Sequence, residues 1–185
     1  MSSRFTAEQT PLDGVVHLKR NPIGDTRGFL ERLFCIDEID AWGGRAVEQI
    51  NRTRTLSRGT LRGLHFQYPP HAECKYVTCL SGKVFDVAVD LRLGATTYGA
   101  WFGAELSGDA HNALIIPEGY AHGFLTLTDN VEMLYLHSSA HSAAAEGGVN
   151  ALDAMLGIDW PMPIVERSAR DKALPLMRDF QGISQ

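Results

Sequence analysis

The sequence predicts a mainly β protein that folds as one barrel or jelly roll of packed sheets. Short apolar stretches of strand length recur along the chain, and turn residues separate them about every 8 to 12 residues. The long amphipathic helical pattern that a parallel sheet with helical crossovers would require is not found. There is no internal repeat, low-complexity tract or linker. We therefore expect one domain over residues 1–185, with its core at about residues 15–165.

The individual elements can be predicted in chain order. Residues 15–19 and 28–34 have strand character and are joined by a turn-rich segment. Residues 36–42 give the best short helix, which Gly43 and Gly44 end. The later strands are expected at residues 76–80, 83–91, 98–106, 112–116 and 131–136. The proline-containing tail is expected to pack against the barrel irregularly or in short helices.

Composition argues against several classes of function. The formal net charge is −5 and the basic residues are scattered, which argues against nucleic acid as a partner. No run of about 18 apolar residues could span a membrane, and the N-terminus lacks the apolar stretch of a secretory signal. The three cysteines, Cys35, Cys74 and Cys79, form no CxxC pair. They indicate reduced thiols in a cytoplasmic protein.

A first cluster of chemical groups runs from Arg62 to Gln67 and is followed by Lys75. Histidine is the natural general base near neutral pH, so His65 is a candidate, and a lysine can stabilise a developing oxyanion. Arg62 and His65 are three positions apart, so a turn or bulge at Gly63 would be needed to aim both inward. The alternative is that His65 is an ordinary buried, hydrogen-bonded histidine.

A second cluster, Pro117 to Phe124, contains a PxGxxH turn that resembles the second motif of cupins. His122 could therefore be a metal ligand, with His65, His71 and Glu73 as its companions. Position 67 is Gln, so the expected HxH pair is missing, and this weakens the metal hypothesis. The alternative is a tight turn entering a strand, with His122 as a structural side chain or a phosphate contact.

Two later residues could also take part in chemistry. Tyr135 shares a strand face with Met133, so it either packs in the barrel or acts as a general acid opposite a base. Asp171 stands in the tail segment SARD. It either caps a helix, carries a surface charge, or orients a histidine.

These segments together, in their order and spacing, resemble the dTDP-4-dehydrorhamnose 3,5-epimerase family. The similarity lies in GTLRGLHFQ, SGKVFDVAVDLR, IIPEGYAHGFLTL, EMLY, GIDWP and SARD, and extends from about Asp25 to Pro175. The resemblance implies a cupin-type jelly roll with short peripheral helices, working as a homodimer without metal or other cofactor. It also implies an isomerase of deoxysugar biosynthesis that inverts C3, C5 or both in a nucleotide-linked 4-keto-6-deoxyhexose, with dTDP as the expected nucleotide.

The resemblance also implies a role for each matching residue. His65 is the base, Asp171 the carboxylate that orients it, and Tyr135 the general acid, while Lys75 lies near the sugar carbonyl. The positions expected to line the nucleotide-sugar site are Arg27, Gln49, Asn51, Arg62, His122 and Glu146. The chemistry agrees with these residue types, because a C4 ketone acidifies the protons on C3 and C5 by forming an enolate.

One segment departs from the family pattern. Ala140 and His141 occupy the positions where an aromatic pair is common in the family, with one ring stacked on thymine. The reaction type is therefore better supported than the nucleotide. Three alternatives stay open: the same chemistry on another nucleotide sugar, a metal-dependent cupin enzyme such as a dioxygenase or sugar isomerase, and a binding module without turnover.

Overall fold

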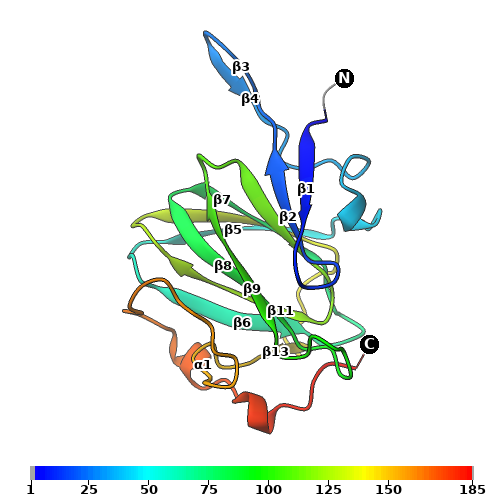
Figure 1. Cartoon of the computed structure of the whole chain (residues 1–185), viewed down its shortest axis with the longest axis vertical. Coiled ribbons are helices and arrows are strands. Elements are labelled where there is room, and N and C mark those ends of the chain that lie inside the picture. The colour runs from blue at the N-terminus through cyan, green and yellow to red at the C-terminus, as the bar shows by residue number, and fades with distance from the viewer. Residues whose placement is uncertain (1–2, 185) are drawn as a thin grey trace.

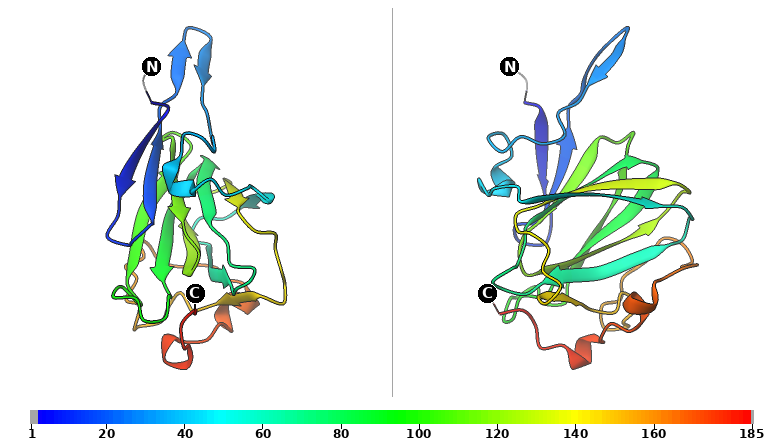
Figure 2. Two further views of the ribbon diagram at one scale, coloured as in Figure 1. Left: turned by 90° about the vertical axis from the view of Figure 1, so that its right-hand side faces the viewer. Right: turned by 180° about the vertical axis from the view of Figure 1, so that it is seen from behind.

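The structure, a computed structural model, describes residues 3–184. Its body is built from two antiparallel sheets that face each other (Figures 1 and 2). The strands of the first sheet are β1 (Phe5–Gln9), β2 (Val16–Arg20), β5 (Gln49–Thr55), β7 (Lys75–Ser81), β10 (Asn112–Ile116) and β12 (Val131–His137). They lie in the order β1-β2-β10-β7-β12-β5. β1 and β5 therefore form the two edges of this sheet.

The second sheet contains β6 (Leu61–Gln67), β8 (Lys83–Asp90), β9 (Trp101–Ser107), β11 (Tyr120–Thr126) and β13 (Glu146–Gly148). Their order is β13-β6-β11-β8-β9. A separate hairpin of β3 (Ile23–Asp25) and β4 (Gly28–Leu30) projects away from the body (Figure 1). The helical elements are one turn each: η1 (Asp40–Trp42), α1 (Ala169–Lys172) and η2 (Met177–Asp179). The predicted cupin-type jelly roll with short peripheral helices is confirmed.

Apolar side chains are buried on both sides of each sheet. The space between the sheets holds one cluster, in which Val77 and Met133 of the first sheet meet Val84 and Phe124 of the second. The outer face of the first sheet is covered by residues around Trp42, and that of the second by the C-terminal tail. β10 and β11 are consequently buried at every position and show no apolar–polar alternation.

Two predictions for the N-terminal region are wrong. Only one 3₁₀ turn, Asp40–Trp42, forms where a helix over residues 36–42 was expected, and the strand expected at 28–34 ends at Leu30. A helix this short is marginal without tertiary contacts. Here the segment is fixed instead by Phe34 and Trp42, whose rings pack edge-on with centroids 5.2 Å apart over the first sheet.

The expected strands do not include β1, β5, β6, β11 or β13. Of the longer strands among these, β5 has the weakest strand pattern. It is an edge strand whose side chains are mostly exposed or half-buried, and its sequence QINRTRT carries no apolar alternation. The strands expected at 76–80, 83–91, 112–116 and 131–136 are confirmed within one residue at each end. The strand expected at 98–106 begins three residues later, at Trp101. No helix within residues 3–184 is long and apolar enough to cross a membrane.

Candidate active site

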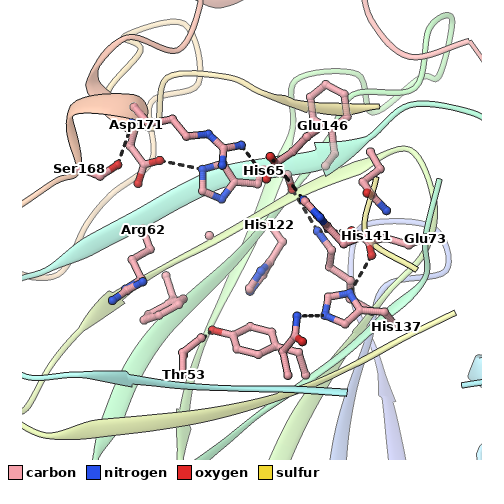
Figure 3. Close-up of a pocket in the computed structure, with 18 of the residues that line it drawn as sticks. Thr53, Arg62, His65, Glu73, His122, His137, His141, Glu146, Ser168 and Asp171 are labelled. Carbon is pink, nitrogen blue, oxygen red and sulfur yellow. Dashed lines mark hydrogen bonds and ion pairs between the residues drawn. The ribbon is translucent and has the colours of Figure 1, made fainter. Parts of the chain in front are cut away.

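A cavity of about 480 Å³ lies between the two sheets, walled by β5, β7 and β12 on one side and β6 and β11 on the other. Residues of the C-terminal tail close part of its rim (Figure 3). The predicted site residues that line it are Gln49, Asn51, Arg62, His65, Lys75, His122, Tyr135, Glu146 and Asp171. Arg27 is the predicted residue that does not.

His65 and Asp171 form a hydrogen-bonded pair although they are far apart in sequence. The Nε2 atom of His65 lies 2.8 Å from Oδ1 of Asp171, and the other carboxylate oxygen accepts the Gly63 N–H at 3.2 Å. Burial on its own would raise the pKa of Asp171, but the hydrogen bond and charge of His65 hold that pKa below its ordinary value. Asp171 is thus ionised at neutral pH. It engages Nε2, which leaves Nδ1 of His65 as the nitrogen that can take a proton from a substrate.

The position of Asp171 is set by a helix start. Ser168 precedes α1, and its Oγ accepts the N–H of Asp171 at 3.0 Å. The three expectations for this residue were a helix cap, a surface charge and the orientation of a histidine, and its burial is against the surface charge. Ser168 takes the capping role, and Asp171, buried in the first turn, faces His65 (Figure 3).

Gly63 provides the irregularity that the spacing of Arg62 and His65 required. His65 pairs with His122 across β6 and β11, whereas Arg62 pairs with Phe124, so the register shifts between them. Gly63 has a φ of +107°, and a Cβ there would lie 2.6 Å from the carbonyl oxygen of His122. Only glycine fits this close approach of two strands. With this irregularity in β6, both Arg62 and His65 line the cavity.

Tyr135 comes from the opposite wall. It lies on β12 of the first sheet, whereas His65 lies on β6 of the second. Its hydroxyl is 3.4 Å from Oγ1 of Thr53, and burial raises the pKa of its phenol well above the ordinary value. The phenol therefore stays protonated at neutral pH and is available as a proton donor facing the cavity.

Lys75 is part of a buried group that sequence reasoning did not assemble. Its Nζ lies 3.1 Å from Oε1 of Glu73 and donates to the backbone carbonyl of His65 at 3.3 Å. The second carboxylate oxygen of Glu73 lies 2.7 Å from Nδ1 of His137. Glu73 had been considered only as a companion in a metal site, and His137 was missed. Glu73 stands two positions before Lys75 in the sequence, and this spacing was the signal that could have found the ion pair.

His122 also has a carboxylate partner. Its Nε2 lies 2.9 Å and 3.0 Å from the two oxygens of Asp86, whose side chain is fully buried on β8. Burial raises the pKa of Asp86, and the charge of His122 acts in the opposite direction. Asp86 was missed as a site residue. Its place among the apolar residues of a strand was the available signal, because a buried carboxylate needs a partner.

The rim of the cavity is polar and charged. Glu146 accepts from Arg170 at 2.6 Å and lies 3.6 Å from His141, whose side chain is half exposed. Burial would raise the pKa of Glu146, but Arg170 keeps it below its ordinary value. Gln49 accepts the backbone N–H of His141 at 2.9 Å. These contacts hold the segment that lacks the aromatic pair against the mouth of the cavity.

Arg27 lies elsewhere in this chain. It belongs to the turn of the projecting β3–β4 hairpin, its side chain is 88% exposed, and it pairs with Asp25 of the same hairpin. A metal centre is not assembled either, because residues 3–184 contain no group of three or more His, Cys, Asp or Glu able to hold an ion. The His65, His71, Glu73 and His122 set does not converge.

The fold and the cavity define a class of protein. A jelly roll whose cavity opposes a carboxylate-oriented histidine to a protonated tyrosine is built to remove a proton from one face of a carbon and return one to the other. This is the arrangement of a racemase or epimerase, both of which are isomerases.

The comparisons with known proteins agree with that class. Residues 9–179 match the family model of dTDP-4-dehydrorhamnose 3,5-epimerase. The dTDP-4-dehydrorhamnose 3,5-epimerase of Salmonella typhimurium is 39% identical over 171 residues, which cover 91% of this chain and 93% of that one. The chain belongs to the dTDP-4-dehydrorhamnose 3,5-epimerase family, as its motifs indicated.

Two further relatives bear on the substrate and the outcome of the reaction. The dTDP-4-dehydrorhamnose 3-epimerase of Streptomyces niveus is 37% identical over 169 residues, covering 91% of this chain and 82% of that one. The solved structure of the dTDP-6-deoxy-D-glucose-3,5-epimerase of Legionella pneumophila contains dTDP-4-keto-L-rhamnose. It superposes with a TM-score of 0.90 at 34% identity, covering 98% of this chain and 99% of that one.

Proposed function

We propose that this protein is a cofactor-independent epimerase that inverts C3 and C5 of dTDP-4-keto-6-deoxy-D-glucose. The observation that carries the proposal is the opposition of His65 and Tyr135 on facing sheets of one cavity, with Lys75 buried in its wall. Family membership supports the reaction class and a nucleotide-sugar substrate. The pathway served would be deoxysugar biosynthesis.

The geometry translates into a sequence of proton movements. The C4 ketone acidifies the neighbouring C–H bonds, and Nδ1 of His65 takes the proton while the bonding electrons move to the C4 oxygen. Lys75 offsets the negative charge that grows on that oxygen. Tyr135 then delivers a proton to the opposite face of the carbon, which inverts the centre. Asp171 keeps Nε2 of His65 protonated, so that Nδ1 remains the base.

The remaining cavity residues are assigned to the nucleotide part of the substrate. Arg62 is suited to the pyrophosphate because guanidinium groups pair with phosphate oxygens in a fixed fork. Gln49, Asn51 and Glu146 supply hydrogen-bonding groups toward the mouth, and His122, fixed by Asp86, lies deeper. With Ala140 and His141 in place of an aromatic pair, base recognition rests on polar contacts.

We further propose that the protein is a cytoplasmic homodimer in which Arg27 serves the partner's cavity. The hairpin that carries Arg27 exposes Ile23, Phe29 and Leu30, whose exposed fractions are 52%, 64% and 68%. Exposed apolar groups of this size favour burial against another chain. The three free thiols, two of them buried, are typical of a reducing compartment.

Complementation tests the dimer and the role of Arg27 together. Arg27→Ala and His65→Ala are expected to be nearly inactive alone. Mixed and re-equilibrated, they should regain activity, because each mixed dimer contains one cavity with both an intact His65 and an Arg27 from its partner. Wild-type light scattering is the control for assembly. A monomer in solution, or mixtures as inactive as their components, would contradict the proposal.

The reaction is tested by incubating the protein with dTDP-4-keto-6-deoxy-D-glucose in D₂O and following deuterium at C3 and C5 by NMR. Entry at both carbons is expected, with an L-rhamno product after a coupled reductase. The relative from Streptomyces niveus, named as a 3-epimerase, supports a second candidate. Deuterium at C3 alone would establish it. The uridine diphosphate analogue is the comparison for base selectivity, and bound metal with loss of activity on chelation would favour a metal-dependent cupin enzyme.

A further inference from the structure

Three charged or titratable side chains form a buried array in one wall of the cavity: Lys75, Glu73 and His137. Their side chains are 10%, 8% and 10% exposed, and all three line the cavity. Lys75 and His137 face each other in the register of β7 and β12, and Glu73 lies just before β7. The array is therefore part of the cavity wall and is not a surface ion pair.

Glu73 is shared between its two neighbours. Oε1 of Glu73 lies 3.1 Å from Nζ of Lys75. Oε2 of Glu73 lies 2.7 Å from Nδ1 of His137 (Figure 3). Burial would raise the pKa of Glu73, but the hydrogen bond from His137 and the charge of Lys75 hold it below its ordinary value. Glu73 is thus an anion placed beside the cation that must meet the substrate's C4 oxygen.

This placement has a cost for catalysis that His137 reduces. A carboxylate next to Lys75 fixes the ammonium group in place, but it also competes with the substrate oxygen for the charge of that group. A donor on the second oxygen of Glu73 draws part of the negative charge away from Lys75. Asp86, which is itself paired with His122, also interacts electrostatically with Lys75. The remaining contact of Lys75 Nζ is the neutral carbonyl of His65.

We propose that Glu73 and His137 are positioning residues that together fix Lys75 and set how much of its charge reaches the C4 oxygen of the substrate. The pair acts through Lys75 and need not touch the reacting atoms. The inference rests on the proposed function for its catalytic consequence. The electrostatic linkage within the array exists with or without substrate.

The substrate-free protein offers a direct measurement. The chain has four lysines, Lys19, Lys75, Lys83 and Lys172, so ¹³C-labelled lysine gives a spectrum in which Lys75 can be assigned by its loss in Lys75→Arg. Glu73→Gln removes the neighbouring anion and should lower the titration midpoint of Lys75 by about 1 pH unit or more. His137→Leu leaves Glu73 to act on Lys75 alone and should raise the midpoint by about half a unit.

A conservative variant and a kinetic profile complete the test. His137→Asn keeps a donor near the place of Nδ1 and should return the Lys75 midpoint toward the wild-type value. In the pH–kcat profile the alkaline limb should move to lower pH in Glu73→Gln and to higher pH in His137→Leu. The KM of each variant should change less than about threefold.

A merely structural pair would lower thermal stability without shifting the titration midpoint of Lys75 in opposite directions. Unmoved midpoints, or midpoints that move the same way, would overturn the inference. Opposite midpoint shifts with an unaffected kcat limb would support the linkage and instead refute the role of Lys75 in the proposed reaction.

Discussion

Replacing Asp171 by Asn tests the base assignment, because the local hydrogen bonds dictate which way the amide must point. One oxygen of Asp171 accepts the Gly63 N–H and the other lies against Nε2 of His65. In the Asn variant the carbonyl is expected to stay on the Gly63 N–H, which leaves the NH₂ group facing Nε2. Nε2 must then accept, the proton moves to Nδ1, and the nitrogen facing the substrate can no longer act as a base.

The size of the effect follows from two losses. Removing a hydrogen bond to a charged group costs about 1.5–3 kcal/mol. In the Asn variant the active tautomer of His65 would point its Nε2–H at the NH₂ group, and leaving this donor unpaired costs about 1–3 kcal/mol. Because each 1.36 kcal/mol is tenfold in rate, the sum of about 2.5–6 kcal/mol corresponds to a loss of roughly 10²–10⁴ in kcat. Asp171→Ala suffers only the first loss, so its kcat should fall by roughly 10–150-fold.

The assay is deuterium entry at C3 and C5 under single-turnover conditions, with thermal melting and binding of thymidine diphosphate as controls for folding and ligand binding. The Asn variant should be slower than the Ala variant while melting at the higher temperature, since it still satisfies Gly63. An Ala variant that is the slower of the two, with both folded, would refute the tautomer argument. Wild-type exchange in either variant would refute the assignment of His65 as the base.

Three other predictions follow from the same structure. Tyr135→Phe removes the phenol that burial keeps protonated, so net epimerisation should fall about 10²–10⁴-fold in the coupled assay. Deuterium exchange should decrease less than epimerisation, and inversion at the wild-type rate would exclude Tyr135 as the acid. Gly63→Ala places a Cβ 2.6 Å from a backbone oxygen and should reduce the free energy of unfolding in urea by more than about 2 kcal/mol. The control is Gly44→Ala, which has positive φ (+67°) but open space, so equal losses in the two would attribute the effect to φ alone. Because the pKa of Asp171 is lowered in the folded state, its contribution to stability is present above its unfolded pKa of about 3.9 and is lost as pH falls through the folded value. The melting temperature of wild type should therefore drop more than that of Asp171→Asn between about pH 6 and pH 3, and parallel decreases would contradict the linkage.

Much of the fold could be predicted from local pattern, and the failures have physical causes. Strands such as β8 and β12 were found because their apolar positions repeat with the strand period. β5 was not, since an edge strand with few buried positions leaves no such pattern. The helix expected at residues 36–42 failed because so short a segment takes its conformation from the sheet on which Trp42 packs. The extent of the domain, residues 1–185, stays a prediction.

The candidate site divides in a similar way. His65, Tyr135 and Asp171 could be named because they stand in segments whose order and spacing are those of a known family. Asp86 and His137 were not named, because the partner that gives each residue its role is brought close only by strand pairing. The opposite holds for Arg27. Motif matching placed it in the site, but in the single chain it lies on a projecting hairpin.

By itself the sequence determined the class of fold, the family and the residue types available for proton transfer, because these depend on periodicity and on residues close together in the chain. Only the tertiary structure decided which groups meet. The contact between His65 and Asp171 joins residues 106 positions apart, and that between His137 and Glu73 joins residues 64 apart. Antiparallel sheet packing sets such distances, and local sequence does not encode them, because each depends on the register of several strands at once.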